Sequence, residues 1–295
     1  MGSMRVAIGV ALAILIPSAA AAHGVHAGIT SDPRVFSPWD QAALAGLTIL
    51  GALYWIGVRE LRARNTGPSR IERAAFGAGW LALVASILPW FDAAALDLFS
   101  AHMAQHELMM LVGAPLIVAG RPLATCLWGL PEAWRRRIAL PLQQPTVAGL
   151  TRTMTAPVTA WTLHGLAVWI WHAPGLYELA VRSEPVHTLQ HAMFISTSVL
   201  FWWGLVYGRY GRAGYGAAVF YVFTTAVHTG ILGAMLTFAP SPLYGVYATP
   251  GHLDPLGDQQ LAGLVMWIPA GLLLTVMGVG LFAAWLGEAE RRTAT

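Results

Sequence analysis

The pattern His-x-x-Gln-His occurs twice, in "AHMAQHELMM" at 101–110 and in "PVHTLQHAMF" at 185–194. Residues four apart lie on one face of an α-helix, so each copy presents two imidazoles in the same direction. Neutral imidazole is the commonest protein ligand for copper, zinc, iron and nickel. The repeated pattern therefore predicts a shared site for one metal ion or two neighbouring ions. Its candidate ligands are His102, His106, His187 and His191.

The surrounding sequence indicates that this chemistry takes place within a membrane. Hydrophobic residues make up 56% of the 295 residues and charged residues only 11%, whereas soluble domains carry about 25% charged residues. The single cysteine, Cys126, excludes an internal disulfide and any Cys-x-x-Cys metal motif. The net charge of +3 comes from arginines in short connections, which bear on topology rather than on nucleic acid. The composition predicts an integral membrane protein that contacts the lipid bilayer and no nucleic acid.

Residues 1–22 are expected to be removed from the mature chain. An added Met-Gly-Ser precedes Met4, and an apolar run and the small-residue site "AAA" at 20–22 follow Arg5, which together are typical of a secretory signal peptide. Cleavage would leave an exterior segment, 23–38, that begins "HGVHAG". His23 and His26 in this segment are candidates for the first contact with an incoming metal.

Seven apolar segments are long enough, at roughly 17 to 25 residues, to cross a bilayer as helices. They lie near 39–61, 71–91, 98–119, 155–173, 184–207, 215–238 and 259–286. Together they predict one all-α seven-helix membrane domain, 39–287, followed by a tail at 288–295. Arginines concentrate after the first, third and fifth segments and after the last. The positive-inside rule then places the mature N-terminus outside and the C-terminal tail in the cytoplasm.

This topology assigns a depth to the histidines. Segments 3 and 5 both run inward, so the four paired histidines lie roughly 5 to 12 Å below the outer boundary, at 1.5 Å per residue. His172, at the end of segment 4, and His228, in segment 6, approach the same layer and complete the predicted set of ligands. The exterior connection 239–258, rich in proline, glycine and tyrosine, is expected to form an ordered cap.

Other polar residues are candidates for auxiliary roles around the metal. The glutamine of each repeat could orient a ring nitrogen, and methionine is a soft ligand suited to Cu(I), although it is also a common apolar filler. Glu107 follows His106 but lies about 100° round the helix. The auxiliary set is Gln105, Glu107, Gln190, Asp258, Gln259 and Met266.

Five segments in a fixed order carry a family resemblance. They are "FSAHMAQHELMMLVGAPLIVAGRPL", "WIWHAPGLYELAV", "VHTLQHAMFISTSVLFWW", "GAMLTFAPSPLYGVY" and "DQQLAGLVMW". From about residue 40 to 287 the chain resembles the CtaG family of caa3-type cytochrome c oxidase assembly factors. It does not resemble the unrelated single-span copper chaperone of the same abbreviation, which uses a Cys-x-Cys pair.

The resemblance implies a multi-pass protein of the bacterial inner membrane that helps to deliver copper, as Cu(I) or Cu(II), to the CuB centre of oxidase subunit I. Its partners would be subunit I or other oxidase assembly factors. By position, the family motifs fall on His102, His106, His172, His187 and His191, and on Asp258, Gln259, Gln260, Met266 and Trp267. Zinc is the alternative metal, because a site made only of imidazoles discriminates poorly against it.

Two other classes of function remain open from the sequence. The first is an intramembrane metalloenzyme, a hydrolase or an oxidoreductase, although His-x-x-Gln-His-Glu differs from the zinc-hydrolase motif His-Glu-x-x-His. The second is a haem-binding electron-transfer protein, which would need one axial histidine from each of two helices rather than pairs on one helix. The copper-delivery hypothesis predicts a protein that is not an enzyme.

Overall fold

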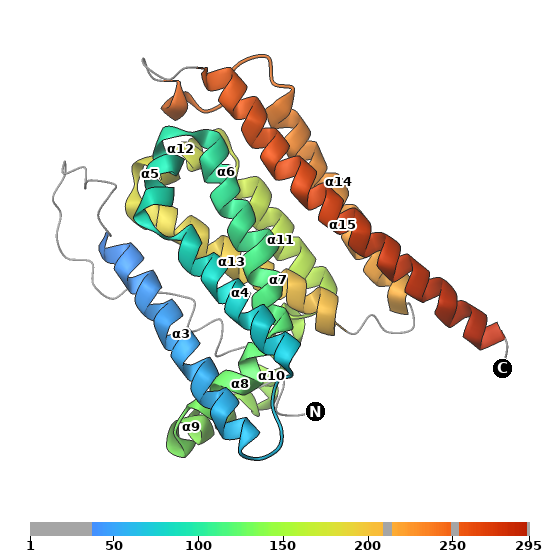
Figure 1. The fold of residues 1–295 in the computed structure, drawn as a ribbon. Helices are drawn as coiled ribbons and strands as arrows, with labels where there is room; N and C mark the ends of the chain where they lie inside the picture. The colour runs from blue at the N-terminus through green and yellow to red at the C-terminus, as the bar shows by residue number, and fades with distance from the viewer. Residues whose placement is uncertain (1–36, 209–213, 249–253, 294–295) are drawn as a thin grey trace.

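The computed structural model describes residues 37–208, 214–248 and 254–293, and within these ranges every regular element is a helix (Figure 1). The signal peptide, the exterior segment and its His23 and His26 lie outside the described residues. Along the chain the helices are α3 (Pro38–Arg62), α4 (Arg70–Ser86), α5 (Pro89–Asp97), α6 (Phe99–Glu107), the π-helix η1 (Leu108–Gly113), α7 (Ala114–Ala119), α8 (Pro122–Gly129), α9 (Glu132–Leu142), α10 (Pro145–Met154), α11 (Pro157–Trp171), α12 (Pro174–Arg182), α13 (Glu184–Tyr207), α14 (Gly214–Thr237), the 3-10 helix η3 (Gly245–Tyr247) and α15 (Pro255–Thr293).

The described helices confirm an all-helical membrane protein but not the count of seven spans. Helices α3, α13, α14 and the first part of α15 are each long and apolar enough to cross a membrane. Two bent pairs raise the number to six: α4 with α5, bent by 54°, and α6–α7 with α8, bent by 65°. Helix α11, with 15 residues, is shorter than the roughly 17 residues that a perpendicular span requires. The seventh span and the orientation in the membrane remain predictions.

Local sequence signals explain where the helices begin. Ser37 and Asp40 form a reciprocal capping box at α3, with each backbone N–H bonded to the other side chain at 3.0–3.1 Å. Ser69 and Glu72 do the same at α4. Proline occupies the first turn of most of the remaining helices, where its missing N–H has no intrahelical partner to lose. Most helix starts are therefore encoded locally.

The segment predicted as one helix at 98–119 is interrupted directly after its histidines. Residues 108–113 form a π-helical turn between α6 and α7. Pro115, in the first turn of α7, cannot donate a backbone hydrogen bond, and its ring crowds the preceding turn. A widened turn accommodates that ring, and such turns are frequent at functional sites.

Helix α6, which carries the first histidine pair, is held at its N-terminus by α15. Its own N-cap residue, Leu98, provides no side-chain cap. Instead, the Asp258 carboxylate accepts hydrogen bonds from the backbone N–H of Phe99 at 2.6 Å and of Ser100 at 3.2 Å, and from the Ser100 hydroxyl. A carboxylate at this position satisfies free N–H groups and complements the helix dipole. A residue 159 positions along the chain thus fixes the start of α6.

Helices α3 and α8 approach so closely that only glycine fits between them. A Cβ atom on Gly57 would lie 1.8 Å from the carbonyl oxygen of Thr125, and one on Gly129 would lie 2.0 Å from that of Leu53. Small residues permit this kind of backbone contact between membrane helices. The contact ties the arginine-rich end of α3 to the segment that follows α7.

Candidate metal centre

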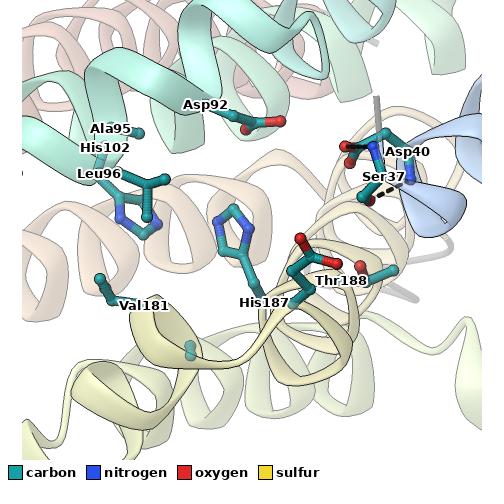
Figure 2. A pocket seen from close by; sticks show the side chains of 11 residues that line it. Ser37, Asp40, Asp92, Ala95, Leu96, His102, Val181, His187 and Thr188 are labelled. Carbon is teal, nitrogen blue, oxygen red and sulfur yellow. Dashed lines mark hydrogen bonds between the residues drawn. The ribbon is translucent and has the colours of Figure 1, made fainter. Parts of the chain in front are cut away.

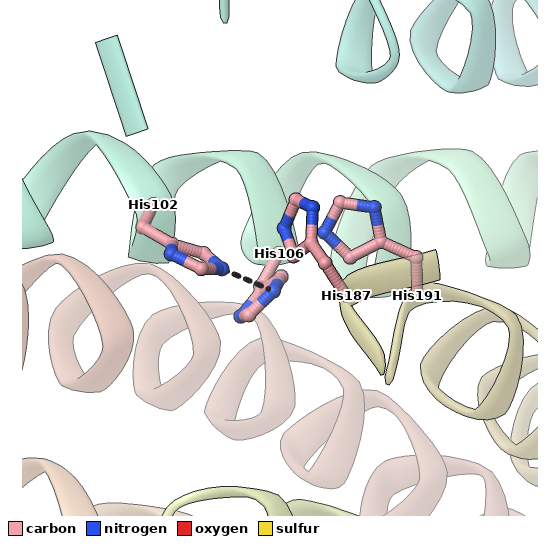
Figure 3. A group of neighbouring side chains, drawn as sticks. All are labelled: His102, His106, His187 and His191. Carbon is pink, nitrogen blue, oxygen red and sulfur yellow. Dashed lines mark hydrogen bonds between the residues drawn. The ribbon is translucent and has the colours of Figure 1, made fainter. Parts of the chain in front are cut away.

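The two histidine pairs converge on one point between α6 and α13 (Figure 3). Each ring offers one nitrogen, and these four nitrogens all lie within 4.8 Å of one another. We call this group the histidine cluster; its members are His102, His106, His187 and His191. The geometric expectation from the i, i+4 spacing is met, because each helix directs both of its rings toward the other helix.

The spacing of the rings is compatible with a shared ion. Nε2 of His102 lies 3.1 Å from Nε2 of His106, and two nitrogens bound tetrahedrally to one metal at about 2.05 Å would be ~3.3 Å apart. The rings of His102 and His187 pack edge to face with their centroids 5.1 Å apart. The rings of His106 and His191 do the same, with centroids 5.2 Å apart. The cluster is thus compact and draws on both helices.

The cluster also leaves several buried nitrogens without a partner. His102 and His106 are 2% and 1% exposed, and His191 is 9% exposed. Nδ1 of His106 and Nε2 of His187 and of His191 make no hydrogen bond. Buried polar atoms are normally paired, and each unpaired one costs about 1–3 kcal/mol. A cation can satisfy several lone pairs at once, so the donor set fits a bound metal ion.

Tyr247, which the sequence reasoning did not single out, contacts the cluster directly. Its hydroxyl lies 3.0 Å from Nδ1 of His102 and donates to the carbonyl oxygen of Ala95 at 2.9 Å. Burial raises the pKa of Tyr247 above its ordinary value, so the hydroxyl keeps its proton. Because that single proton goes to the carbonyl, Nδ1 of His102 must be the donor in its contact with Tyr247. The lone pair of His102 then lies on Nε2, which faces the cluster.

The predicted exterior cap explains how Tyr247 reaches His102. Its first part, 239–248, contains η3, and Tyr247 and Tyr244 are buried in it. The Gln259 side chain accepts a hydrogen bond from the backbone of Leu243 at 2.6 Å and so ties the connection to α15. Tyrosine content was the only sequence signal for this contact, and it did not specify which histidine the connection meets.

The two remaining candidate ligands lie in different places. The ring of His172 lies near the rings of Tyr177 and Phe194, with centroids 6.3 and 6.1 Å away, and these two rings in turn pack on His102 and His106. Its Nδ1 donates to the Val168 carbonyl at 2.6 Å, and its Nε2 is buried without a partner. His228 does not join the cluster.

The ring of His228 instead packs edge to face on Trp161. A Cβ atom on Gly165 would lie 3.7 Å from it. The sequence predicted a layer shared with His172, whereas the structure places His228 beside Trp161 and Gly165, at least seven residues before His172 along the chain.

The auxiliary residues also separate into groups. The Gln105 amide nitrogen donates to the Ser86 carbonyl at 2.6 Å and to Asp92 at 2.5 Å, so it joins α6 to α4 and α5 instead of orienting an imidazole. Neither polar atom of the Gln190 side chain has a partner. Asp258 and Gln259 anchor α6 and the exterior cap, as described above.

Glu107 and Met266 line a separate cavity of about 40 Å³ that contains none of the four clustered histidines. His164 is on the wall of the same cavity. The turn of about 100° between His106 and Glu107 thus directs the carboxylate away from the histidine cluster.

Comparison with known proteins identifies the family. The family model described as cytochrome c oxidase caa3 assembly factor matches residues 52–288. An uncharacterized protein of Mycobacterium leprae is 26% identical over 270 residues, which cover 88% of this chain and 41% of that protein. An uncharacterized protein of Mycobacterium bovis is 24% identical over 277 residues, with 89% and 41% covered. The chain therefore spans about two fifths of the length of these relatives, and no solved structure matches it.

The family match runs from the middle of α3 to the last turns of α15 and includes every member of the histidine cluster and Tyr247. The chain belongs to the family of cytochrome c oxidase caa3 assembly factors.

Proposed function

We propose that this protein binds copper at the histidine cluster and delivers it to cytochrome c oxidase in the bacterial inner membrane. Membership in the oxidase assembly family supports the destination. The proposal that the bound metal is copper rests mainly on one observation. Four imidazoles converge, and several of their buried nitrogens have no hydrogen-bond partner. The recipient is the CuB centre of subunit I, reached directly or through other assembly factors.

The donor set favours copper among the divalent metals of the first transition row. Affinity at a nitrogen site rises along the row to copper and falls again at zinc. The cluster contains neither thiolate nor carboxylate, so it lacks the thiolates that hold copper most firmly. Copper could then pass from the imidazoles of this cluster to the imidazoles of the acceptor by ligand exchange, because both sites use the same type of ligand. Zinc fits the same ligands and is the competing metal.

Two alternative functions receive less support from the geometry. A haem needs an open slot between two axial rings, whereas the rings of the cluster contact one another edge to face. A hydrolase that used Glu107 as its base would need that carboxylate beside the metal, and Glu107 lines a different cavity.

Metal loading of the purified protein tests the proposal. Wild type, a His106→Ala/His191→Ala double variant and the control His228→Ala are loaded anaerobically with copper and analysed for bound metal and for their optical spectra. We expect copper on wild type and on His228→Ala, because His228 lies outside the cluster, and none above background on the double variant.

Equal copper on all three proteins would exclude the histidine cluster as the binding site. A Soret band in the protein as purified would favour the haem alternative. Bound zinc together with hydrolytic turnover would favour the enzyme.

A further inference from the structure

A polar cavity connects the surface with the histidine cluster (Figure 2). It measures about 90 Å³ and lies between the start of α3, helix α5, the end of α12 and the start of α13. The rings of His102 and His187 form part of its wall, and Figure 2 shows them facing one another there. At about 10–15 Å³ for each water, this volume holds roughly six to nine waters, which is enough for a partly hydrated ion.

The charged residues that line this cavity within the described part of the chain are all acidic. They are Asp40, Asp92 and Glu184. Glu184 is exposed, and Asp92 accepts the hydrogen bond from Gln105 described above. A recess lined by charges of one sign attracts counter-ions and raises their local concentration. The cavity is therefore suited to a cation.

A second cavity reaches the cluster from the side and differs in character. It measures about 110 Å³, touches His187 and His191, and is lined mainly by apolar residues of α3, α4 and α13 such as Leu47, Leu83 and Ile195. An apolar wall replaces none of the water that a hydrated cation would lose on entering. Asp40 and Thr188 border both cavities, but Asp92 and Glu184 line only the acidic one, which therefore offers more oxygen ligands along the way to the histidines.

We propose that the acidic cavity is the loading port through which a hydrated divalent copper ion reaches the histidine cluster. Asp40, Asp92 and Glu184 capture the ion, and His187 and His102 then replace its water and carboxylate ligands. Oxygen ligands suit an aquated ion, and imidazole nitrogens bind copper more strongly. The exchange changes no oxidation state and, at neutral imidazoles, releases no proton. This inference rests on the proposed copper binding and adds its route and its capturing residues.

The loading port makes a kinetic prediction that differs from that of the cluster. Carboxylates that capture and steer an ion increase its association rate, by about 10- to 1000-fold in a strongly focused field, and the effect weakens as salt screens the charges. They contribute little to the final complex when the ion rests on imidazoles. Removing them should therefore slow loading and leave the bound stoichiometry unchanged.

Stopped-flow mixing of the full chain with Cu²⁺ alone tests this prediction. The rate of loading is measured from the absorbance change that accompanies coordination of Cu²⁺ by imidazole. The variants are Glu184→Gln, Asp92→Asn and a triple variant that also carries Asp40→Asn. The amide replacements keep side-chain size and leave an oxygen that can accept the hydrogen bonds from Ser37 and Gln105. Asp97→Asn is the matched control, because Asp97 is an exposed carboxylate on the same helix as Asp92 and does not line the cavity.

At low salt we expect the triple variant to load at least about tenfold more slowly, with full final occupancy and a flatter dependence on salt. Glu184→Gln alone should slow loading measurably, and Asp97→Asn should change it less than twofold. Loading of the triple variant at the wild-type rate, or equal slowing by Asp97→Asn, would overturn the loading port and leave copper binding intact. Absence of bound copper from wild type at equilibrium would overturn both proposals. Because Glu184 is exposed, its single variant keeps the test available if the triple variant does not fold.

Discussion

The hydroxyl of Tyr247 lies 3.0 Å from Nδ1 of His102 and donates its hydrogen bond to the carbonyl oxygen of Ala95. This arrangement fixes His102 in the tautomer that presents the Nε2 lone pair to the other three histidines. A residue on the connection between α14 and α15 thereby selects which nitrogen lone pair of His102 faces the cluster. The same hydroxyl also lies 3.2 Å from that of Tyr177, so the orientation of His102 depends on an extended polar contact between elements.

Replacing Tyr247 by phenylalanine should weaken metal binding without removing a ligand. His102 would lose the partner of its Nδ1–H, and loss of such a partner lowers metal affinity by about 10- to 100-fold. Isothermal titration with copper in a competing chelator measures the change. Tyr215→Phe, at a half-exposed position near the start of α14, is the control and should bind as wild type does. Unaltered affinity in Tyr247→Phe would show that the hydroxyl does not control His102.

In cells, replacing His191 by alanine should leave the oxidase short of copper. Removing one ligand weakens a multidentate site and leaves its neighbours unsatisfied within the bundle. The oxidase purified from this strain should therefore contain less copper per haem, and added external copper should partly restore activity. A strain with His228→Ala is the control. A normal ratio in cells that contain stably inserted His191→Ala protein would contradict copper delivery.

Replacing Asp258 by alanine should destabilise the start of α6. Loss of a helix cap costs about 0.5–2 kcal/mol, and here the cap is a carboxylate that bonds both Phe99 and Ser100. Thermal unfolding in detergent should show a lower midpoint and metal titration a lower copper affinity, because α6 positions two ligands. Asp97→Ala, on the exposed side of α5, should leave both quantities near their wild-type values. If the Asp258 variant matches this control, the cap does not determine the position of α6.

Replacing Gly57 by alanine should force α3 away from α8. The new methyl group would lie within 1.8 Å of the Thr125 carbonyl oxygen, closer than any van der Waals contact allows. Overpacking of this kind costs about 1–3 kcal/mol. Gly46→Ala on the same helix, with no heavy atom within 4 Å of the added carbon, should have little effect. The free energy of unfolding in a mixed-detergent titration distinguishes the two variants, and equal values would argue against the close contact.

Reporter fusions test the predicted orientation. A fluorescent protein fused after Gly67, in the arginine-rich connection between α3 and α4, should fluoresce, because that connection is predicted to be cytoplasmic. Alkaline phosphatase fused after Asp254 should be active, because that connection is predicted to be exterior. The loading port lies at the end of α3 opposite Gly67, so this result would place the port outside. Reversed activities would place it in the cytoplasm and exclude loading from the exterior.

The sequence by itself determined the helical class and which histidines pair on one helix face. Apolar segments of spanning length specify helices, because a backbone in lipid must satisfy its own hydrogen bonds. Spacing of four residues directs two side chains to one face in any helix. For this reason His102 with His106, and His187 with His191, could be paired from the sequence.

Only the tertiary structure decided which groups meet across helices. Depth along a span leaves open the direction in which a side chain points, so His228 shared the predicted layer and yet lies beside Trp161. Gln105 and Gln190 occupy equivalent places in the repeat, but only Gln105 finds partners, because Ser86 and Asp92 belong to helices that pack on α6. Tyr247 reaches His102 from 145 residues away. Such contacts depend on how the helices rotate and cross when they pack, and no local pattern in the chain encodes that rotation.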